Sequence, residues 1–391
     1  MNALAPIGDA GPLLIEKVDV RLFRVPPATK WEDSTHRVPA IEIIVVELTV
    51  AGRVARGFSY TVGVGGTAVR ALLLDYCRSV LVGQDARYVV ANWSILRNHL
   101  RRTGMGALTT LALAAIDIAF WELRCQQSGR PLGIEAGGGR STIPAYASGI
   151  DLHLAPDEIH ALLAGQRSAG YQWFKIKVGL PALAADMARV AAAREAIGPD
   201  NRLLLDANQG WDLAEAVRRC QAFERFDPYW IEEPMVSEDV AAHAALRQKT
   251  AIPVAIGESL YTLEEFHAYL RADAVDVLQP DIARVGGLTP WLRIADLASA
   301  WGRPVAPHFF VELSVHALCA IDNGLVLENV GGGSLHELGL AAAPLAIADG
   351  MATPPMAPGH GVDFRLDGDS ARFEVPLSGY SFADVRSHKH A

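Results

Sequence analysis

The sequence is poor in cysteine, has no excess of basic residues and contains no long apolar run, and each shortage excludes a class of protein. Only four cysteines occur among 391 residues, at Cys77, Cys125, Cys220 and Cys319, and none forms a CxxC pair. Cysteines this sparse and widely spaced predict buried, reduced thiols in place of a disulfide framework.

The charge balance excludes proteins that depend on a basic surface. Thirty-five Lys and Arg against 44 Asp and Glu give a formal net charge of −9, which provides no positive field for nucleic acid or an anionic membrane. No stretch approaches the roughly 20 apolar residues of a membrane span. The first residues do not form a charged start with an apolar core, because Asp9 interrupts them. The cytoplasm is therefore the expected location.

The length suits two domains better than one hydrophobic core, and the first part of the chain has its own pattern. Half of the residues are hydrophobic and a fifth are charged, as in ordinary globular proteins. Strands are expected over 16–24, 41–50 and 57–61, and helices over 68–81 and 107–126. Strands followed by helices predict a small α+β domain over residues 1–140.

The pattern changes near residue 140, where short aliphatic runs begin to alternate with helix-length segments. The runs are Ile143–Ala147, Trp173–Val178, Leu203–Asn208, Tyr229–Glu233, Val254–Glu258, Val275–Asp281, Pro304–His308 and Leu325–Asn329. Eight strand–helix units predict an α/β fold, a parallel (β/α)8 TIM-type barrel over residues 141–355. A doubly wound open sheet is the alternative, but even spacing favours closure. Residues 356–391 are expected to return to the first domain.

Polar residues end most of the predicted strands, and three carboxylates stand out among them. Asp206, Glu232 and Glu258 follow three consecutive strands, and strand ends of a barrel converge on one mouth. Adjacent strands lie roughly 4.8 Å apart, so the three acids would repel one another unless a cation lies between them. Oxygen ligands favour Mg²⁺. A solvated acid at each strand end is the simpler alternative for any one of them.

Two lysines and a histidine supply candidate bases at the same mouth. Lys175 and Lys177 share one strand face, and two adjacent ammonium groups are expected to lower each other's pKa. A solvated basic strand end and a Schiff-base lysine are the alternatives. His308 and Asp281 end neighbouring strands, so the aspartate is expected to fix the imidazole tautomer. Glu328, on the eighth strand, could donate a hydrogen bond as a protonated acid.

Taken in order, these segments resemble the enolase superfamily, and within it the mandelate racemase subgroup. The matching segments are Lys175-Ile176-Lys177, Leu205-Asp206-Ala207-Asn208, Ile231-Glu232-Glu233-Pro234, Gly257-Glu258-Ser259, Gln279-Pro280-Asp281 followed by Gly286-Gly287, Pro307-His308 and Leu327-Glu328. They cover the whole predicted barrel, and the N-terminal layout resembles the capping domain of that family.

The resemblance implies a role for each matching residue. Asp206, Glu232 and Glu258 would bind Mg²⁺, while Lys177 and His308 would be the two acid/base groups. The following residues would support them: Asp281 would pair with His308, Lys175 would tune Lys177 and contact the substrate carboxylate, and Glu328 would hydrogen-bond the intermediate. The chemistry implied is removal of the proton next to a carboxylate to give an enediolate.

The same residues serve several reactions, so the outcome stays open. Dehydration of a sugar acid to a 2-keto-3-deoxy acid is placed first by analogy, because it is the more frequent activity in the subgroup that the chain resembles. The segment Gly57-Phe58-Ser59-Tyr60-Thr61 resembles some sugar-acid dehydratases of the family, which favours the same reaction. Racemisation, epimerisation or cycloisomerisation of an anhydro sugar acid comes second. A Schiff-base aldolase and a non-catalytic sugar-acid sensor are alternatives of other classes. The resemblance also implies a homo-oligomer, either a dimer or an octamer.

Substrate contacts are expected mainly from the capping domain. Two loops, residues 26–39 and 60–66, would cover the barrel mouth and exclude water. The side chains expected to reach the far end of the substrate are Trp31, His36, Arg37 and Tyr60. Arg37 would suit a second carboxylate, although a surface arginine is the simpler interpretation. Asn208, two residues after Asp206, would orient a ligand or a metal-bound water.

Overall fold

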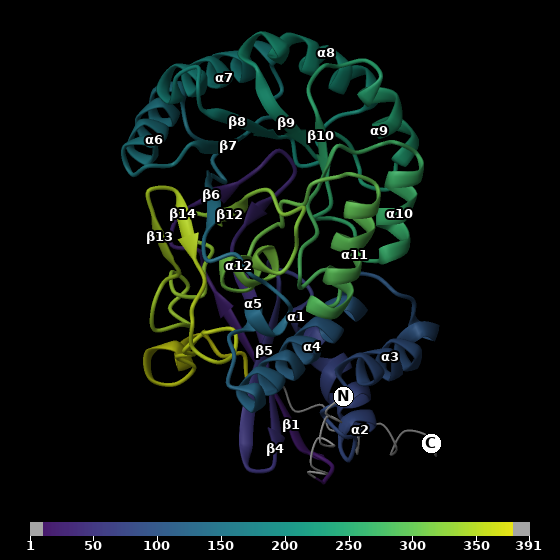
Figure 1. Cartoon of the computed structure of the whole chain (residues 1–391). Coiled ribbons are helices and arrows are strands. Elements are labelled where there is room, and N and C mark those ends of the chain that lie inside the picture. The colour runs from purple at the N-terminus through teal and green to yellow at the C-terminus, as the bar shows by residue number, and fades with distance from the viewer. Residues whose placement is uncertain (1–10, 378–391) are drawn as a thin grey trace, which may run out of the picture.

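Residues 11–377 are described by a computed structural model, in which an N-terminal cap lies at one end of a barrel (Figure 1). Asp9 and the last fourteen residues of the segment 356–391 lie outside the described residues. Between residues 11 and 377, no helix is long and apolar enough to cross a membrane.

The cap is built on a three-stranded antiparallel sheet. Its strands are β1 (Ile15–Val25), β4 (Ile41–Val50) and β5 (Arg53–Thr61), in the order β1-β4-β5. Helix α4 (Ala107–Ser128) is buried along almost its whole length and packs against β5. At Gly57 a Cβ would collide with the backbone of α4 at Ala115 and Ala119, so glycine permits this close approach.

The two helical segments predicted in the cap are present, and two helices are additional, over 89–100 and 132–135. The cap helices are α1 (Gly66–Ala71), a π-helical turn (Leu72–Cys77), α2 (Arg78–Leu81), α3 (Val89–Leu100), α4 and α5 (Leu132–Glu135). Helix α3 was not predicted, although Val89, Trp93, Leu96 and Leu100 form a buried stripe with helical spacing.

The second part of the chain closes into the predicted parallel barrel. Its strands are β6 (Ile143–Ser148), β7 (Trp173–Lys177), β8 (Arg202–Asp206), β9 (Pro228–Glu232), β10 (Val254–Ile256), β11 (Val277–Leu278) and β12 (Leu327–Val330). Each pairs in parallel with the next as far as β11, and β12 pairs with β6. Val305 bridges Leu278 on one side and Gly324 on the other, which completes the ring.

The seventh strand, predicted over Pro304–His308, is therefore reduced to one bridging residue. Pro304 and Pro307 flank Val305 and Ala306. Proline has no N–H to donate to a strand ladder, so the run cannot pair over its whole length. The fifth and sixth strands are also shorter than predicted.

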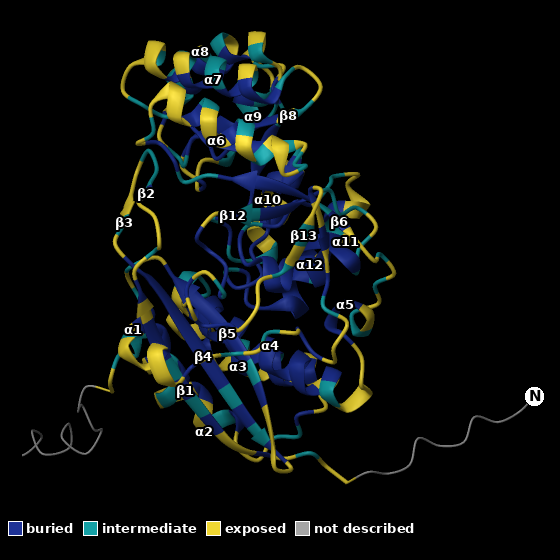
Figure 2. Ribbon diagram, turned by 90° about the vertical axis from the view of Figure 1, so that its left-hand side faces the viewer, coloured by how far each residue is buried: buried dark blue, intermediate teal, exposed yellow. Residues whose placement is uncertain are grey.

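Helices lie around the barrel strands (Figure 1), and Figure 2 shows that the exposed faces of these helices point outward while the barrel strands are buried. The helices are α6 (Pro156–Ser168), α7 (Leu183–Ile197), α8 (Leu213–Phe223), α9 (Val240–Arg247), α10 (Leu263–Arg271), α11 (Leu288–Ala300) and α12 (Val311–Cys319). Side-chain caps fix where some of them begin. Thr262 and Glu265, for example, form a capping box at the start of α10.

After the barrel, the chain forms a small hairpin and then runs back along the cap. Strands β13 (Ala346–Ala348) and β14 (Met351–Thr353) form the hairpin, which was not predicted and pairs with β6. Arg21 of β1 forms an ion pair with Glu374. The described part of the segment that follows the hairpin is irregular and contains a 3-10 turn (Gly368–Phe373). The boundaries near residues 140 and 355 stay predictions.

One short hairpin of the cap reaches over the barrel (Figure 2). It consists of β2 (Trp31–Glu32) and β3 (Arg37–Val38), within the loop predicted to cover the mouth. The Glu32 carbonyl accepts a hydrogen bond from the Leu152 N–H at 3.1 Å, and the Glu32 N–H donates to Ile150. We call residues 31–38 the lid.

A buried acid between cap and barrel makes stability depend on pH. Asp117 of α4 accepts a hydrogen bond from the Thr289 N–H at 2.9 Å, and burial raises its pKa to about 7. In the unfolded chain, the pKa of this aspartate is near 3.9. Between the unfolded and the folded pKa, the folded state therefore binds more protons than the unfolded state, and the stability of the protein falls as pH rises.

We expect Asp117→Asn to reduce this loss by an amount on the order of a few kcal/mol. Urea unfolding of wild type and variant at pH 5 and pH 7.5 measures it. Asp296→Asn, on the exposed face of α11, is the control. An equal pH dependence in wild type and Asp117→Asn would contradict the assignment.

Candidate active site

The acids predicted at the strand ends lie side by side at the end of the barrel that the cap covers. In the parallel register Lys177 is level with Asp206, and Asp206 is level with Glu232. Glu258 follows β10 by two residues. One oxygen from each of the three acids lies within 4.8 Å of the others, and all three residues are buried. Three buried carboxylates at this separation could hold a metal ion, as predicted.

The balance of charges around the three acids suits a divalent cation. Five carboxylates (Asp206, Glu232, Glu258, Asp281 and Glu328) face three basic side chains (Lys175, Lys177 and Arg284) through ion pairs and the His308 bridge. If all are ionised, two negative charges are in excess. A hard divalent cation bound by oxygen ligands would balance them, so the residues present fit the magnesium ion that the sequence predicts.

The two lysines are buried and ion-paired, which changes the pKa argument. Lys177 Nζ lies 2.5 Å from Asp206, and Lys175 Nζ lies 2.8 Å from Glu232 and 2.7 Å from Glu328. Burial lowers the pKa of both lysines, but the adjacent carboxylates raise it by more. The expectation that the lysines would lower each other's pKa is thus outweighed here. A cation bound to Asp206 would weaken the effect on Lys177.

The predicted His308–Asp281 pair is formed. His308 Nδ1 lies 2.7 Å from Asp281 Oδ2, and Asp281 Oδ1 accepts the backbone N–H of Ala283 and of Arg284. With Nδ1 so bonded, Nε2 is the nitrogen left for chemistry; it lies 3.4 Å from a Glu258 oxygen. Burial lowers the pKa of His308, whereas the charge of Glu258 and the hydrogen bond to Asp281 raise it, and the net shift is upward.

Glu328 is near its predicted place but not in its predicted state. It accepts hydrogen bonds from Ser148 Oγ at 2.8 Å and from the Phe309 N–H at 2.9 Å, in addition to its ion pair with Lys175. Burial raises its pKa, but Lys175 and His308 lower it further, so that it lies well below its usual range. Glu328 is a carboxylate that accepts hydrogen bonds. The prediction of a protonated donor is wrong for this arrangement.

One cavity of about 620 Å³ is lined by both lysines, by His308 and by all five residues predicted to contact or orient a ligand, which are Trp31, His36, Arg37, Tyr60 and Asn208. Among residues 11–377, no hydrogen-bond partner is found for the buried atoms Trp31 Nε1 and Asn208 Oδ1. The side chain of Arg37 is 81% exposed and pairs with Glu32. Tyr60 differs from its prediction, because its hydroxyl bonds Asp281 at 2.6 Å.

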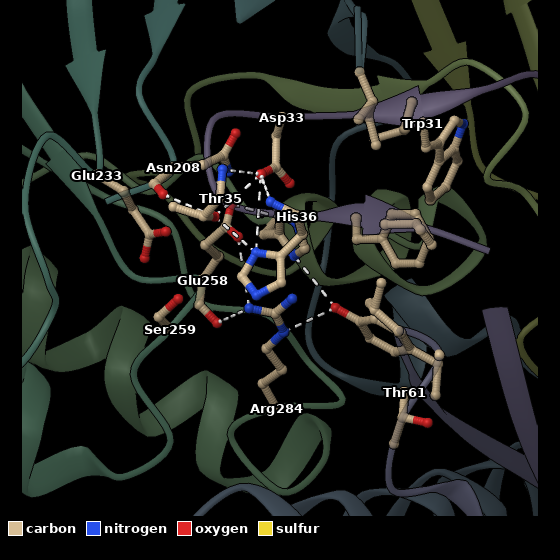
Figure 3. A pocket seen from close by; sticks show the side chains of 18 of the residues that line it. Trp31, Asp33, Thr35, His36, Thr61, Asn208, Glu233, Glu258, Ser259 and Arg284 are labelled. Atoms are coloured by element: carbon tan, nitrogen blue, oxygen red, sulfur yellow. Dashed lines mark hydrogen bonds and ion pairs between the residues drawn. The ribbon is translucent and has the colours of Figure 1, made fainter. Parts of the chain in front are cut away.

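Several cavity residues were not identified as candidates from the sequence. Arg284 lies beside Glu258 (Figure 3) and donates to the Glu258 carbonyl at 2.8 Å. A charged residue between Asp281 and Gly286-Gly287, just after a strand, could have indicated it. Glu233, whose pKa burial and the charge of Glu258 raise to about 8, also faces the cavity.

Backbone strain is concentrated around this cavity. Eight described residues other than glycine have positive φ, and four of them line it: Asn208 (φ 41°), Gln209 (φ 64°), Glu233 (φ 40°) and Phe309 (φ 56°). Such conformations are costly and persist where the surroundings enforce them, often at functional sites. The strain therefore supports this cavity as the candidate active site.

Two hydroxyl groups hold the lid over the cavity. Ser34 Oγ donates to the Ala207 carbonyl at 2.5 Å, and Thr35 Oγ1 donates to the Asn208 carbonyl at 3.2 Å. Ser34 can pack here because the residue facing it is glycine: a Cβ at Gly210 would lie 2.8 Å from Ser34 Oγ. Figure 3 shows Asp33, Thr35 and His36 of the lid gathered close to Asn208.

Comparison with known proteins identifies the family. Residues 17–133 match the mandelate racemase/muconate lactonizing enzyme N-terminal domain, and residues 158–368 match the enolase C-terminal domain-like family. The chain therefore belongs to the mandelate racemase branch of the enolase superfamily, as the resemblance implied.

Three relatives are informative. A 3,6-anhydro-alpha-L-galactonate cycloisomerase of Streptomyces coelicolor is 35% identical over 89% of this chain and 96% of its own. An L-talarate/galactarate dehydratase of Salmonella typhimurium is 33% identical over 78% of this chain and 79% of its own. A racemase from Streptomyces coelicolor A3(2), solved with bound magnesium, has a TM-score of 0.89 at 34% identity and covers 93% of this chain and 100% of that chain.

The lid contact can be tested with Gly210→Ala. The added methyl group should displace Ser34, which we expect to raise KM about tenfold, since overpacking costs on the order of 1–3 kcal/mol. Trypsin cleavage after Lys30 and Arg37 should become faster, which reports the lid without an assay of activity.

Two further variants control this test. Gly165→Ala, in α6, has nothing near the added Cβ and should leave cleavage unchanged. Ser34→Ala should also speed cleavage, because it removes the hydroxyl that bonds the Ala207 carbonyl. Unchanged cleavage in Gly210→Ala would show that the position of the lid does not depend on the contact between Ser34 and Gly210.

Proposed function

We propose that the protein removes the proton next to the carboxylate of a sugar acid, in a site that holds Mg²⁺ on Asp206, Glu232 and Glu258. The observation that carries this proposal is the placement of two different bases, Lys177 and His308, on the wall of one cavity whose floor is a buried carboxylate triad. Membership of the family and the magnesium-bound racemase structure support the metal.

The two bases reach the cavity from different sides. Lys177 ends β7, whereas His308 follows Val305, and β6 and β12 separate these positions around the ring. A substrate carbon between them would present one face to the amine and the other to the imidazole. A bound magnesium ion would supply a Lewis acid for the substrate carboxylate.

In the first step, one base takes the α-proton and the C–H electron pair moves into the carboxylate. Negative charge then grows on oxygens near Lys175, whose ammonium group Glu328 and Glu232 hold in place. Charge that is already oriented toward such oxygens is usually the largest catalytic contribution. The Lys177 amine must be neutral to act as this base, so it has to give up its proton before each turnover that starts from it.

The opposite base decides the outcome of the reaction. If it protonates the same carbon from the other face, the product is the epimer. If it protonates a hydroxyl on the next carbon, that C–O bond breaks, water leaves and a 2-keto-3-deoxy acid forms. We place dehydration first. Cycloisomerisation of an anhydro sugar acid is the second candidate, supported by the 35% identical cycloisomerase.

The charges of the cavity favour an acid with a single carboxylate. Every lysine and arginine that lines it already has an acidic partner, which is Glu32 in the case of Arg37. The outer wall also carries apolar side chains, among them Val38, Val62 and Leu111. A second carboxylate would have to displace Glu32 from Arg37. We therefore favour aldonic or anhydro sugar acids over aldaric acids.

The Schiff-base alternative fits less well. Lys177 is ion-paired at 2.5 Å to Asp206, which favours the protonated amine over the nucleophilic one. The buried carboxylate triad would have no purpose in such a reaction. A sensor without catalysis remains an outcome of the experiment below.

The organisation of the protein belongs to the same proposal. We infer a capping domain over residues 1–140, completed by 356–391, and a catalytic barrel over 141–355. The four cysteines are buried and unpaired, which supports a reducing compartment, the cytoplasm. A homo-oligomer, dimer or octamer, follows from the family resemblance, and sedimentation would establish it.

Proton NMR in D₂O tests the reaction. With Mg²⁺ and pools of aldonic, uronic and aldaric acids, we expect loss of an α-proton signal and new 3-deoxy methylene signals, chiefly from an aldonic acid. The double variant Lys177→Ala/His308→Ala should be slower by at least about 10²- to 10⁴-fold. Exchange without methylene signals would indicate an epimerase. Tight binding without exchange of any acid would contradict the proposal and favour the sensor.

Thermal unfolding tests the metal independently of turnover. After exhaustive chelation, addition of Mg²⁺ should raise Tm, because an ion at 100 times its Kd stabilises by about 2.7 kcal/mol. Glu258→Gln should lose most of this increase. Glu264→Gln, on the exposed surface of α10, should retain it. An identical Tm with and without Mg²⁺ in the wild type would contradict the metal assignment.

A further inference from the structure

Tyr60 of the cap belongs to a continuous chain of hydrogen bonds that ends on His308. Arg284 Nε donates to the Tyr60 hydroxyl at 3.0 Å, and that hydroxyl donates to Asp281 Oδ2 at 2.6 Å. His308 Nδ1 contacts the same Asp281 oxygen at 2.7 Å. The chain therefore has one consistent direction, in which Asp281 accepts from both Tyr60 and His308.

We propose that Tyr60 is a positioning residue for His308, which it holds through Asp281, and not a residue that contacts the far end of the substrate. This inference rests on the proposed function only for its catalytic consequence, since the geometry is independent of the substrate. Arg284 supports the same arrangement from the side of Glu258.

The Tyr60 hydroxyl keeps its proton and can donate a hydrogen bond, and packing holds the Tyr60 ring in place. The residue is 2% exposed, and its ring packs against Phe309 and Phe310, each at 4.9 Å between ring centroids. Burial raises its pKa well above the usual value for tyrosine, so the hydroxyl keeps its proton. A ring fixed on two sides with its hydroxyl on Asp281 has one orientation.

Asp281 needs this second donor. Its other oxygen, Oδ1, already accepts two backbone N–H groups, so Oδ2 is the atom free to hold the imidazole. Tyr60 fixes where that oxygen lies. Outer partners of this kind typically change the performance of the group they orient by about 10- to 100-fold when removed.

Tyr60 also makes the orientation of His308 depend on the cap. Tyr60 lies in β5 of the cap sheet, whereas Asp281, Arg284 and His308 belong to the barrel. Only a cap docked as in this structure brings the hydroxyl to Asp281. No cap side chain among the described residues is hydrogen-bonded to the amine of Lys177, whose Nζ is bound by Asp206 from the neighbouring barrel strand. The two bases should therefore respond differently to a change at Tyr60.

This difference defines the experiment. Wild type and Tyr60→Phe, both with Mg²⁺ in D₂O, are given each of two pairs of C2 epimers separately: galactonate and talonate, and galactarate and talarate. Exchange of the α-proton is followed by NMR. His308→Asn identifies the epimer from which His308 removes the proton. Tyr269→Phe, which removes a buried hydroxyl bonded to the Ser237 carbonyl at 2.7 Å outside the cavity, is the matched control.

We expect Tyr60→Phe to slow exchange of the His308-dependent epimer about 10- to 100-fold and to slow exchange of the other epimer less than about threefold. Tyr269→Phe should leave the ratio of the two rates unchanged. Equal slowing of both epimers would show a general structural or substrate-binding role and would overturn the proposal, as would no slowing of either.

A second measurement does not depend on turnover. In protein labelled with ¹⁵N-histidine, the Nδ1–H signal of His308 is assigned by its loss in His308→Asn. We expect Tyr60→Phe to shift or broaden this signal and Tyr269→Phe to leave it unchanged. An unaltered signal in Tyr60→Phe would overturn the positioning role. If wild type exchanges none of the four acids, these are not its substrates, and this signal alone decides the role of Tyr60.

Discussion

Repulsion among buried carboxylates is the constraint on which this site depends. Asp206, Glu232, Glu258 and Glu328 are all less than a tenth exposed, and acids in such surroundings are stable as anions only beside positive charge. Lys175 meets three of them at once. The lysine thus stabilises the folded barrel, and the same charge lies where the proposed reaction develops negative charge on its substrate.

The remaining excess of negative charge explains why a divalent ion fits and why the lysines are held as they are. Asp206 interacts with both Lys175 and Lys177 and is also one of the three proposed metal ligands. An ion on Asp206 would weaken its hold on Lys177 and favour the neutral amine. The metal and the base are coupled through one carboxylate, so neither can be understood alone.

Much of this was predictable from sequence because the barrel repeats one unit. Each aliphatic run ends close to a polar residue, and parallel strands bring those ends together; this predicted Asp206, Glu232 and Glu258 at one place. The seventh strand was wrong in extent because Pro304 and Pro307 limit its pairing to Val305, which a hydrophobic pattern does not reveal.

The errors at the site have a common cause, which is that side-chain partners depend on distance in space. The ionised state of Glu328 follows from Lys175 at 2.7 Å, and sequence spacing does not specify that contact. Tyr60 was assigned to the substrate because it lies beside a predicted cap loop. Its hydroxyl instead bonds Asp281, which is 221 positions away in the sequence. Arg284 was overlooked because its two partners, Tyr60 and Glu258, come from different domains of the fold.

The central claim is that two bases act on opposite faces of one carbon, and separated epimers test it most directly. Lys177→Ala and His308→Asn, each with Mg²⁺ in D₂O, would be given pure galactonate and pure talonate, and loss of the α-proton would be followed by NMR. The account predicts that each variant fails with one epimer only and that the two variants fail with opposite epimers. Failure of both variants with the same epimer, or activity of both with either epimer, would contradict it.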